Sequence, residues 1–286
     1  MKVSFIVPTY NRAHMVSETI DSILAQTFQD FEIIVVDNES TDNTEAVIKA
    51  YNDRRIKYFK NQNNGVVAVN RNYGITKSQG EYIAFCDDDD LWLPEKLERQ
   101  VREFEKDSQV GLVCTNGINF DSDGEHGARI KAKLSDRYFT FESLIWGNAI
   151  IGSSVLVKKQ AIDEVGMMDE SPEVFSSEDY DLWLRIAKKY RIKYIDLPLI
   201  KYRVHADAHG NVYRTHTDAR GRKGSGSLKE PNLAVYKKLM DKGILHYDLY
   251  QKRIKNPTRQ TLPLSFPGYD WIIKWASFFK RVFRPN

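Results

Sequence analysis

Four consecutive carboxylates, Asp87–Asp90, follow directly after the apolar run Tyr82–Phe85. An apolar strand that ends in acids delivers them to the edge of a sheet, and in open α/β sheets ligands bind at the carboxyl ends of the strands. Adjacent anions repel one another, so a cation is expected there. Oxygen ligands suit Mg²⁺ or Mn²⁺, which take carboxylates together with substrate phosphates. The structural alternative is a solvated acidic turn that caps the next helix, because Asp is a good N-cap residue.

Apolar runs alternate with helical patterns over the first half of the chain. The runs expected to be strands are Val3–Val7, Phe31–Val36, Ile56–Phe59 and Tyr82–Phe85. Alternation at this spacing predicts βα units, so the expected fold class is α/β, with a Rossmann-like, mostly parallel sheet flanked by helices. Further strands are expected at 110–114, 118–120, 153–157 and 192–204, helices from Pro94 to about 106 and over 180–190, and a loop over the polar stretch 121–133.

Length, net charge, cysteine positions and the length of the apolar runs restrict the kind of protein that this chain can be. The 286 residues allow one large domain or a domain with an appendage, and a net charge of +3 implies no nucleic-acid partner. The two cysteines, Cys86 and Cys114, lie in apolar runs, which favours buried thiols in a reducing cytoplasm over a disulfide framework. No apolar run approaches the roughly 18–20 residues of a membrane span. We therefore expect a cytoplasmic protein.

Three of the expected strands end in polar residues that suit a nucleotide. These ends are Pro8-Thr9-Tyr10-Asn11-Arg12, Asp37-Asn38 and Asp87–Asp90. In a parallel sheet they share one edge, so they are expected to form one pocket with an aromatic ring for a base, an acid for base or ribose hydrogen bonds, and acids for a metal-bound diphosphate. The patterns G-x-G-x-x-G and G-x-x-x-x-G-K-[ST] are absent, so neither a dinucleotide site nor a P-loop is supported.

Six ordered stretches of the chain resemble family 2 inverting glycosyltransferases, of the type that builds bacterial and archaeal polysaccharides. They are Phe5–Arg12, Ile34–Asp42, Asn70–Gly74, Ala84–Trp92, Ser177–Arg185 and Tyr202–His205. Their order makes the resemblance specific, whereas any one of them alone would be weak. The resemblance implies the nucleotide-sugar-binding fold known as GT-A, a divalent metal (Mn²⁺ or Mg²⁺), and inversion at the anomeric carbon of the sugar.

The resemblance also implies roles for the residues that match the family's motifs. The nucleotide-binding set would be Pro8, Thr9, Tyr10, Arg12, Asp37, Asn38, Arg71, Asp87 and Asp88. The metal would be held by Asp89 and His205, and the catalytic base would be Asp179. The family more often has a small residue where this chain has Asp88, so the assignment between Asp88 and Asp89 stays open.

Each of these residues also has a purely structural interpretation. Tyr10 can close a strand, Asp37 can cap a helix, and Arg71 is by default a solvated residue. Asp179 lies at an expected helix start, where acids favour the helix dipole, and His205 suits a surface or packed position. The functional interpretation is favoured because these residues share positions at strand ends and helix starts.

The function that these expectations favour is metal-dependent, inverting transfer of a sugar from a nucleoside-diphosphate sugar, with a UDP-sugar favoured. The acceptor would be a hydroxyl of a glycan or of a lipid-linked glycan. One alternative is a sugar-phosphate nucleotidyltransferase, which would need a glycine-rich phosphate loop near residue 10, and this chain has no glycine there. The other is a non-catalytic nucleotide-sugar-binding partner, a class marked by loss of the base, whereas Asp179 is present. The sugar and the acceptor are not specified by the sequence.

The expected domains are a catalytic domain over 1–228 and a helical extension over 229–286. Within the first, 1–110 would be the nucleotide-binding half, and 111–228 the acceptor half with a mobile loop at 206–227. In the extension, aromatic and basic residues alternate over 269–284 in a helical pattern. That pattern suits a peripheral helix on the inner face of the cell membrane, or equally a helix that packs on the catalytic domain or on a second copy in a homo-oligomer.

Overall fold

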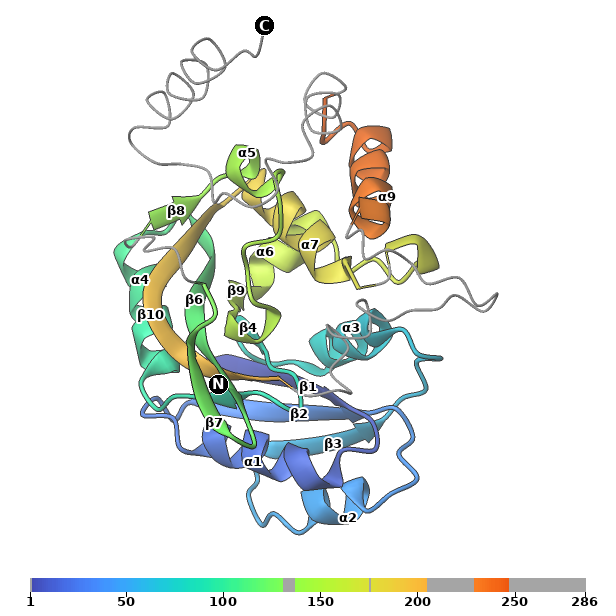
Figure 1. Cartoon of the computed structure of the whole chain (residues 1–286), viewed down its shortest axis with the longest axis vertical. Coiled ribbons are helices and arrows are strands. Elements are labelled where there is room, and N and C mark those ends of the chain that lie inside the picture. Colours follow the sequence, from blue (N-terminus) through green and yellow to red (C-terminus); the bar gives the residue numbers. More distant parts are fainter. Residues whose placement is uncertain (1, 131–136, 175, 205–228, 247–286) are drawn as a thin grey trace, which may run out of the picture.

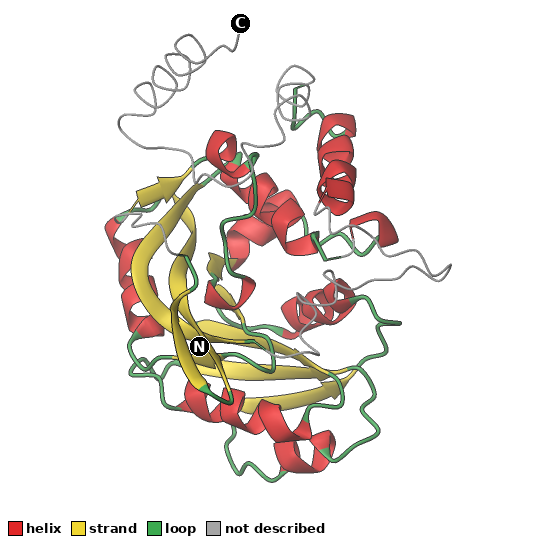
Figure 2. Ribbon diagram, in the orientation of Figure 1, coloured by secondary structure: helices red, strands yellow, loops and turns green. Residues whose placement is uncertain are grey.

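The structure is a computed structural model that describes residues 2–130, 137–174, 176–204 and 229–246 (Figure 1). His205, the loop expected at 206–227 and the helix expected at 269–284 therefore lie outside the described residues. The described strands form one mixed sheet in the order β3-β2-β1-β4-β9-β6-β10-β5, with β7 paired to β6 and β8 to β10. Helices lie on both sides of this sheet (Figure 2).

The amino-terminal half contains the four parallel strands that the alternation predicts. They are β1 (Val3–Thr9), β2 (Phe31–Asp37), β3 (Ile56–Lys60) and β4 (Tyr82–Phe85), and they alternate with α1 (Ala13–Leu24), α2 (Thr44–Lys49) and α3 (Val67–Lys77). Figure 1 shows α1 and α2 on one side of these strands and α3 on the other. Successive side chains therefore enter two cores: Phe5 and Val7 pack in the cluster that contains α1, and Ile6 packs in the cluster that contains α3. A strand that is covered on both faces has a continuous run of apolar residues in its sequence, as these strands do.

The second half extends the same sheet. Its elements are β5 (Leu91–Trp92), α4 (Lys96–Lys106), β6 (Val110–Asp121), β7 (Gly124–Ala128), β8 (Arg137–Phe139), α5 (Phe141–Leu144), the 3₁₀ turn η1 (Gly152–Ser154), β9 (Leu156–Lys158), α6 (Lys159–Val165), the 3₁₀ turn η2 (Pro172–Val174), α7 (Glu178–Ala187) and β10 (Arg191–Arg203). Strand β9 runs antiparallel between β4 and β6, so it joins the two halves of the sheet.

Several sequence-based boundaries in this half were wrong. The two strands expected at 110–114 and 118–120 are one strand, β6, and the loop expected over 121–133 contains β7, which pairs with β6 as a hairpin. Strand β7 is exposed along its whole length, so it lacks the apolar alternation by which a strand is recognised. The strand expected at 153–157 begins as η1 and continues as β9, and α4 begins two residues after Pro94.

Helix α9 (Lys229–Asp241) packs on the second half of the molecule. Its buried residues Val235, Tyr236 and Leu239 belong to the same core cluster as the buried residues of α7. The hydroxyl of Tyr236 donates to the carbonyl of Ile145 at 2.9 Å. The domain boundary expected at residue 228 falls between the described segments and stays a prediction. No helix among the described residues is long and apolar enough to cross a lipid bilayer.

Candidate active site

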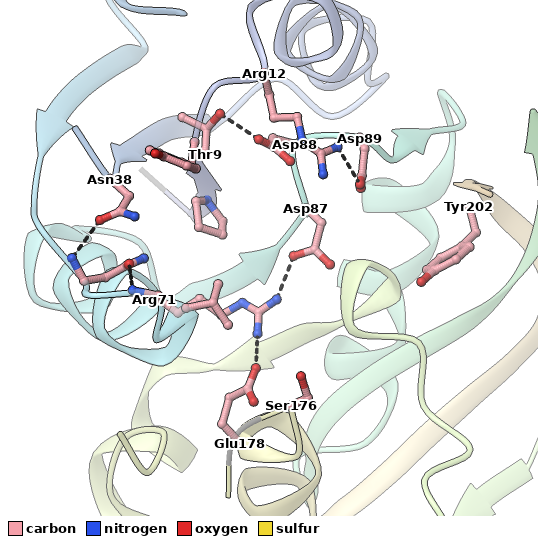
Figure 3. Close-up of a pocket in the computed structure, with 15 residues that line it drawn as sticks. Thr9, Arg12, Asn38, Arg71, Asp87, Asp88, Asp89, Ser176, Glu178 and Tyr202 are labelled. Carbon is pink, nitrogen blue, oxygen red and sulfur yellow. Dashed lines mark hydrogen bonds and ion pairs between the residues drawn. The ribbon is translucent and has the colours of Figure 1, made fainter. Parts of the chain in front are cut away.

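The carboxyl ends of β1, β2 and β4 meet at one edge of the sheet, as the sequence predicts. The parallel registers pair Thr9 with Asp37 and Ile6 with Phe85, which lies just before the acid cluster Asp87–Asp90. A pocket of about 570 Å³ opens at this edge, a size typical of ligand-binding pockets. The residues that line it (Figure 3) are Pro8, Thr9, Tyr10, Arg12, Asn38, Asn63, Gly65, Val67, Arg71, Asp87, Asp88, Asp89, Ser176, Glu178 and Tyr202.

The acid cluster alternates between partly exposed and buried positions. Asp87 and Asp89 are partly exposed at the pocket, with side chains 39% and 15% exposed. Each is paired with a guanidinium: Asp87 Oδ1 lies 2.7 Å from Arg71 Nη2, and Asp89 Oδ2 lies 3.2 Å from Arg12 Nη1 (Figure 3). The protein thus supplies part of the positive charge that four adjacent acids require. The expected alternative, an acidic turn that caps the next helix, is wrong because β5 intervenes and the N-cap of α4 is Glu95.

The two buried acids have raised pKa values. Asp88 accepts a hydrogen bond from Thr9 Oγ1 at 2.7 Å. Burial first, and then the neighbouring charge of Asp89, raises the pKa of Asp88 to about 7. Asp90 is 1% exposed and accepts from the backbone N–H of Arg203 at 2.9 Å. Burial, followed by the charges of Asp89 and Asp87, raises the pKa of Asp90 well above its usual range.

Arg71 connects the two halves of the molecule. Its side chain on α3 contacts Asp87 through Nη2 and Glu178 on α7 through Nη1, at 2.7 and 2.8 Å (Figure 3). It is only 9% exposed, so the interpretation of Arg71 as a solvated helix residue is wrong. Burial opposes its charge, but the carboxylates of Asp87 and Glu178 more than offset this and raise its pKa. Arg71 therefore places a fixed positive charge between the acid cluster and α7.

Asp179 lies in the first turn of α7, beside the pocket rather than in its lining. Its carboxylate accepts from the backbone N–H of Tyr180 at 2.6 Å and from Asn148 Nδ2 at 3.4 Å. Burial first, and then the charge of Glu178, raises the pKa of Asp179 to about 7, against the opposing charge of Arg71. A side chain at position 152 would meet this carboxylate, because a Cβ there would lie 3.7 Å from Asp179 Oδ2. The glycine therefore leaves space beside Asp179.

The other predicted nucleotide-binding residues occupy different positions. Tyr10 is 52% exposed at the pocket, so its ring is available for stacking. Asn38 lines the pocket and accepts from the backbone N–H of Asn63 at 2.8 Å. Asp37 is fully buried and does not line the pocket; its carboxylate accepts from Ser40 and Tyr58. It is not the N-cap of α2, which is Asn43.

Sequence reasoning assigned no role to several lining residues: Asn63, Gly65, Val67, Ser176, Glu178 and Tyr202. Two of them, Glu178 and Tyr202, lie within stretches that carry the family resemblance. The non-glycine residues of the described chain with positive φ are Asn11, Glu39, Asn64 and Ser176, and each is a lining residue or the sequence neighbour of one. Such conformations cost energy and cluster at functional sites. Among non-glycine residues, asparagine is one of those that adopt positive φ most readily, so Asn11 and Asn64 were the sequence signal that could have pointed to these pocket loops.

The pocket offers hard oxygen ligands for a divalent cation. Among the described residues, no three acidic, histidine or cysteine side chains are gathered into a complete metal site. Asp87 and Asp89 nevertheless present carboxylates to the pocket. One or two carboxylates with substrate phosphates are the donor set that Mg²⁺ takes in nucleotide sites, and carboxylate oxygens also suit Mn²⁺. The residues therefore fit a cation that arrives with its nucleotide.

Comparison with known proteins places the chain in a family. The sequence model of Glycosyl transferase family 2 matches residues 4–166. An uncharacterized glycosyltransferase of Rickettsia typhi is 34% identical over 253 residues, which cover 85% of this chain and 76% of that protein. The Escherichia coli protein WfgD, a UDP-Glc:alpha-D-GlcNAc-diphosphoundecaprenol beta-1,3-glucosyltransferase, is 29% identical over 71% of this chain and 77% of its own length. The chain spans only 32% of a longer Rickettsia bellii glycosyltransferase to which it is 34% identical.

Solved structures show the same fold. S. aureus TarS in complex with UDP-GlcNAc aligns with a TM-score of 0.61 at 22% identity, over 73% of this chain and 60% of that chain. The mannosyltransferase PcManGT from Pyrobaculum calidifontis, in complex with GDP-Man and Mn²⁺, aligns with a TM-score of 0.56 at 18% identity, over 99% of this chain and 81% of that chain. With the family match and the sheet described above, this chain belongs to glycosyl transferase family 2 and is an α/β glycosyltransferase of the GT-A fold.

Proposed function

We propose that this glycosyltransferase moves a hexose from a UDP-sugar to a hydroxyl of a glycan or lipid-linked glycan, with inversion at the anomeric carbon. The observation that carries the proposal is the pair Glu178-Asp179 at the start of α7. Glu178 lines the donor pocket, and the next residue is a half-buried carboxylate whose pKa is raised to about 7. A general base is most effective when its pKa lies near the working pH.

The donor side of the pocket supplies stacking, hydrogen bonds and positive charge. The exposed ring of Tyr10 would stack on the base, and Thr9 and Asn38, which also line the pocket, would supply hydrogen bonds. Asp37, whose oxygens are engaged by Ser40 and Tyr58, would support the strand end behind them. Arg12 and Arg71 lie beside the acid cluster, where their guanidinium groups would stabilise charge on the leaving diphosphate. Asp89, together with His205, would hold Mn²⁺ or Mg²⁺, which supplies further electrostatic stabilisation of that charge when bound. The Mn²⁺ in the PcManGT complex supports this part of the proposal.

The transfer itself would be one displacement. The acceptor oxygen forms a bond to the anomeric carbon, the bond from that carbon to the phosphate oxygen breaks, and the diphosphate leaves with the electron pair. The hydroxyl proton passes to Asp179. The contact from Asn148 Nδ2 at 3.4 Å would orient the carboxylate that receives it. A base on the face opposite the leaving group produces inversion.

The acceptor is proposed from a relative. The name of WfgD specifies a diphosphoundecaprenol-linked acceptor and a UDP-Glc donor, which favours a lipid-linked glycan and a UDP-sugar here. The chain would then work at the inner face of the cell membrane, with 269–284 as a peripheral helix. We retain the proposed division into a catalytic domain over 1–228, with nucleotide-binding and acceptor halves, and a helical extension.

The test combines binding with turnover. In a thermal-shift panel of nucleotide sugars with Mn²⁺, we expect UDP-sugars to raise the melting temperature, because a ligand that binds the folded state stabilises it. Asp179→Asn should keep this shift and lose UDP release by ~10²–10⁴-fold, the usual contribution of a general base. Asp163→Asn, which alters an exposed ion pair with Lys159, is the control and should behave like the wild type.

The same experiment distinguishes the alternatives. A nucleotidyltransferase would instead release pyrophosphate from UTP and a sugar 1-phosphate, and a non-catalytic binding partner would show thermal shifts without any UDP release in the wild type. Undiminished UDP release by Asp179→Asn would contradict the assignment of the base.

A further inference from the structure

Arg203, the last residue of β10, contacts the acid cluster from behind the pocket. Its backbone N–H donates to Asp90 Oδ1 at 2.9 Å, and its Nε donates to the backbone carbonyl of Asp89 at 2.8 Å. Arg203 does not line the pocket. It therefore reaches Asp89, the proposed cation ligand, through the backbone and leaves the carboxylate on the pocket side.

The guanidinium of Arg203 is itself held by two other elements. Its Nη2 lies 2.7 Å from the carboxylate of Glu18 on α1, and its central carbon lies 4.5 Å from the ring centre of Phe120 on β6. The side chain is 15% exposed. A planar group with fixed partners on several sides loses little further entropy when it forms each bond. Arg203 is thus a rigid connection between α1, the end of β10 and the acid cluster.

A second residue anchors the same segment. Thr19 on α1 donates through Oγ1 to the backbone carbonyl of Asp90 at 3.0 Å. Consecutive carbonyls of the acid cluster, those of Asp89 and Asp90, are therefore held from one side by Arg203 and Thr19. The backbone N–H of Asp90 also donates to the carbonyl of Asp87 at 3.2 Å, so the acid cluster forms a turn. Holding the carbonyls of Asp89 and Asp90 fixes this turn, from which the carboxylates of Asp87 and Asp89 reach the pocket.

We propose that Arg203 is a positioning residue for the cation and diphosphate: by holding the carbonyl of Asp89, it directs the Asp89 carboxylate into the pocket. The inference rests on the proposed function, in which Asp89 binds the cation. It adds that affinity for the cation depends on a residue that touches neither cation nor nucleotide. Residues in such supporting positions typically contribute 10–100-fold to metal affinity.

The test measures cation-dependent nucleotide binding rather than turnover. The dissociation constant of UDP is measured by calorimetry with Mn²⁺ and again with excess EDTA. The ratio of the value in EDTA to the value with Mn²⁺, which is large when the cation strengthens binding, is compared between variants. Arg203→Gln should reduce the ratio by about tenfold and leave the value in EDTA unchanged. Arg203→Lys should reduce the ratio less, because its ammonium keeps the positive charge. It should still fall short of the wild type, because an ammonium cannot reproduce the planar fork that contacts both Asp89 and Glu18. The melting temperature of each free protein is recorded in parallel.

Arg191→Gln is the matched control, since Arg191 lies at the opposite end of β10 and pairs with Asp107 at 3.0 Å. It should keep the wild-type ratio. An unchanged ratio in Arg203→Gln would overturn the inference, and so would equal weakening in Mn²⁺ and in EDTA, because that is the signature of a merely structural residue. If Arg203→Gln does not fold, Arg203→Lys decides by the same criterion. A wild-type protein whose UDP affinity ignores Mn²⁺ would instead overturn the proposed metal dependence, and the inference with it.

Discussion

The charge of Glu178 should set the pH at which this enzyme begins to work. Asp179 has its pKa raised from 3.8 to about 7, with burial as the first cause and Glu178 as the second. A rise of about three pKa units corresponds to about 4 kcal/mol in favour of the neutral acid. Glu178→Gln removes the second cause but keeps an oxygen that can accept from Arg71 Nη1, whose contact with Glu178 is 2.8 Å. Arg71 then acts on Asp179 with less opposition, so the pKa of Asp179 should fall.

The expected change is large enough to measure. If the Glu178 charge accounts for about one unit, the ionised fraction of Asp179 at pH 6 rises from about one tenth to about one half. Only the ionised form can accept a proton, so activity at pH 6 should rise about fivefold relative to each variant's own plateau near pH 8. The assay is UDP release from a UDP-sugar with Mn²⁺, recorded as kcat/KM between pH 5 and 8.5, because that ratio reports the pKa of the free enzyme. Normalising to the plateau removes any loss of donor binding caused by the change in the pocket.

A control variant isolates the effect of charge. Glu170→Gln removes another carboxylate from the second half of the molecule, one that accepts from Asn72 at 2.7 Å and does not line the pocket. Its pH profile should match the wild type. If the acid limb of Glu178→Gln stays in place or moves to higher pH, then Asp179 does not limit the rate through its ionisation, and the reasoning is refuted.

Four further changes have expected outcomes. Asp88→Asn should stabilise the ligand-free protein, because burial raises the folded-state pKa of Asp88 to about 7 and the ionised acid therefore costs stability increasingly from about pH 4 to pH 7. The gain in the free energy of unfolding, measured by urea denaturation, should be absent below pH 4 and reach at most about 4 kcal/mol at pH 8. An equal gain at both pH values would contradict this. Asp89→Ala should abolish Mn²⁺-dependent UDP binding in calorimetry, and wild-type activity in excess chelator would refute the metal assignment. Tyr236→Phe should cost about 1–2 kcal/mol in urea denaturation, because the buried bond to the carbonyl of Ile145 is lost; no loss would show that this bond is not stabilising. A chain that ends at Pro267 should not float with anionic liposomes while the full chain does, and equal flotation of the two would remove the membrane role proposed for 269–284.

The strands that form the edge of the pocket were predictable because both of their faces are buried. Their apolar runs stand out in the sequence, and the polar residues that follow mark the shared edge. Asp87, Asp89 and Arg12 were found in this way or through the family resemblance, and the structure brings them together. Contacts between distant segments were not predictable. The position of Glu178 depends on Arg71, which is 107 residues away in the chain.

Other misses have local physical causes. Strand β7 is exposed on both faces and is held by pairing with β6, so its sequence carries no periodic pattern. Asp37 follows a strand like the other site residues, yet its two oxygens are used by Ser40 and Tyr58. A carboxylate at a strand end is therefore a candidate ligand from the sequence alone, and only its neighbours reveal whether its oxygens are already engaged.

The packing of α9 has a consequence for how the protein is made. Tyr236 on α9 and Tyr180 on α7 hold the carbonyls of Ile145 and Leu144, their hydroxyls lie 3.1 Å apart, and the segment that follows carries Asn148, the partner of Asp179. Synthesis runs from the amino terminus, and the parallel strands of the amino-terminal half emerge from the ribosome long before α9 does. A nascent chain can therefore form the strand edge of the pocket early, but it completes the packing behind Asp179, the proposed base, only when α9, the last of its described helices, has been made.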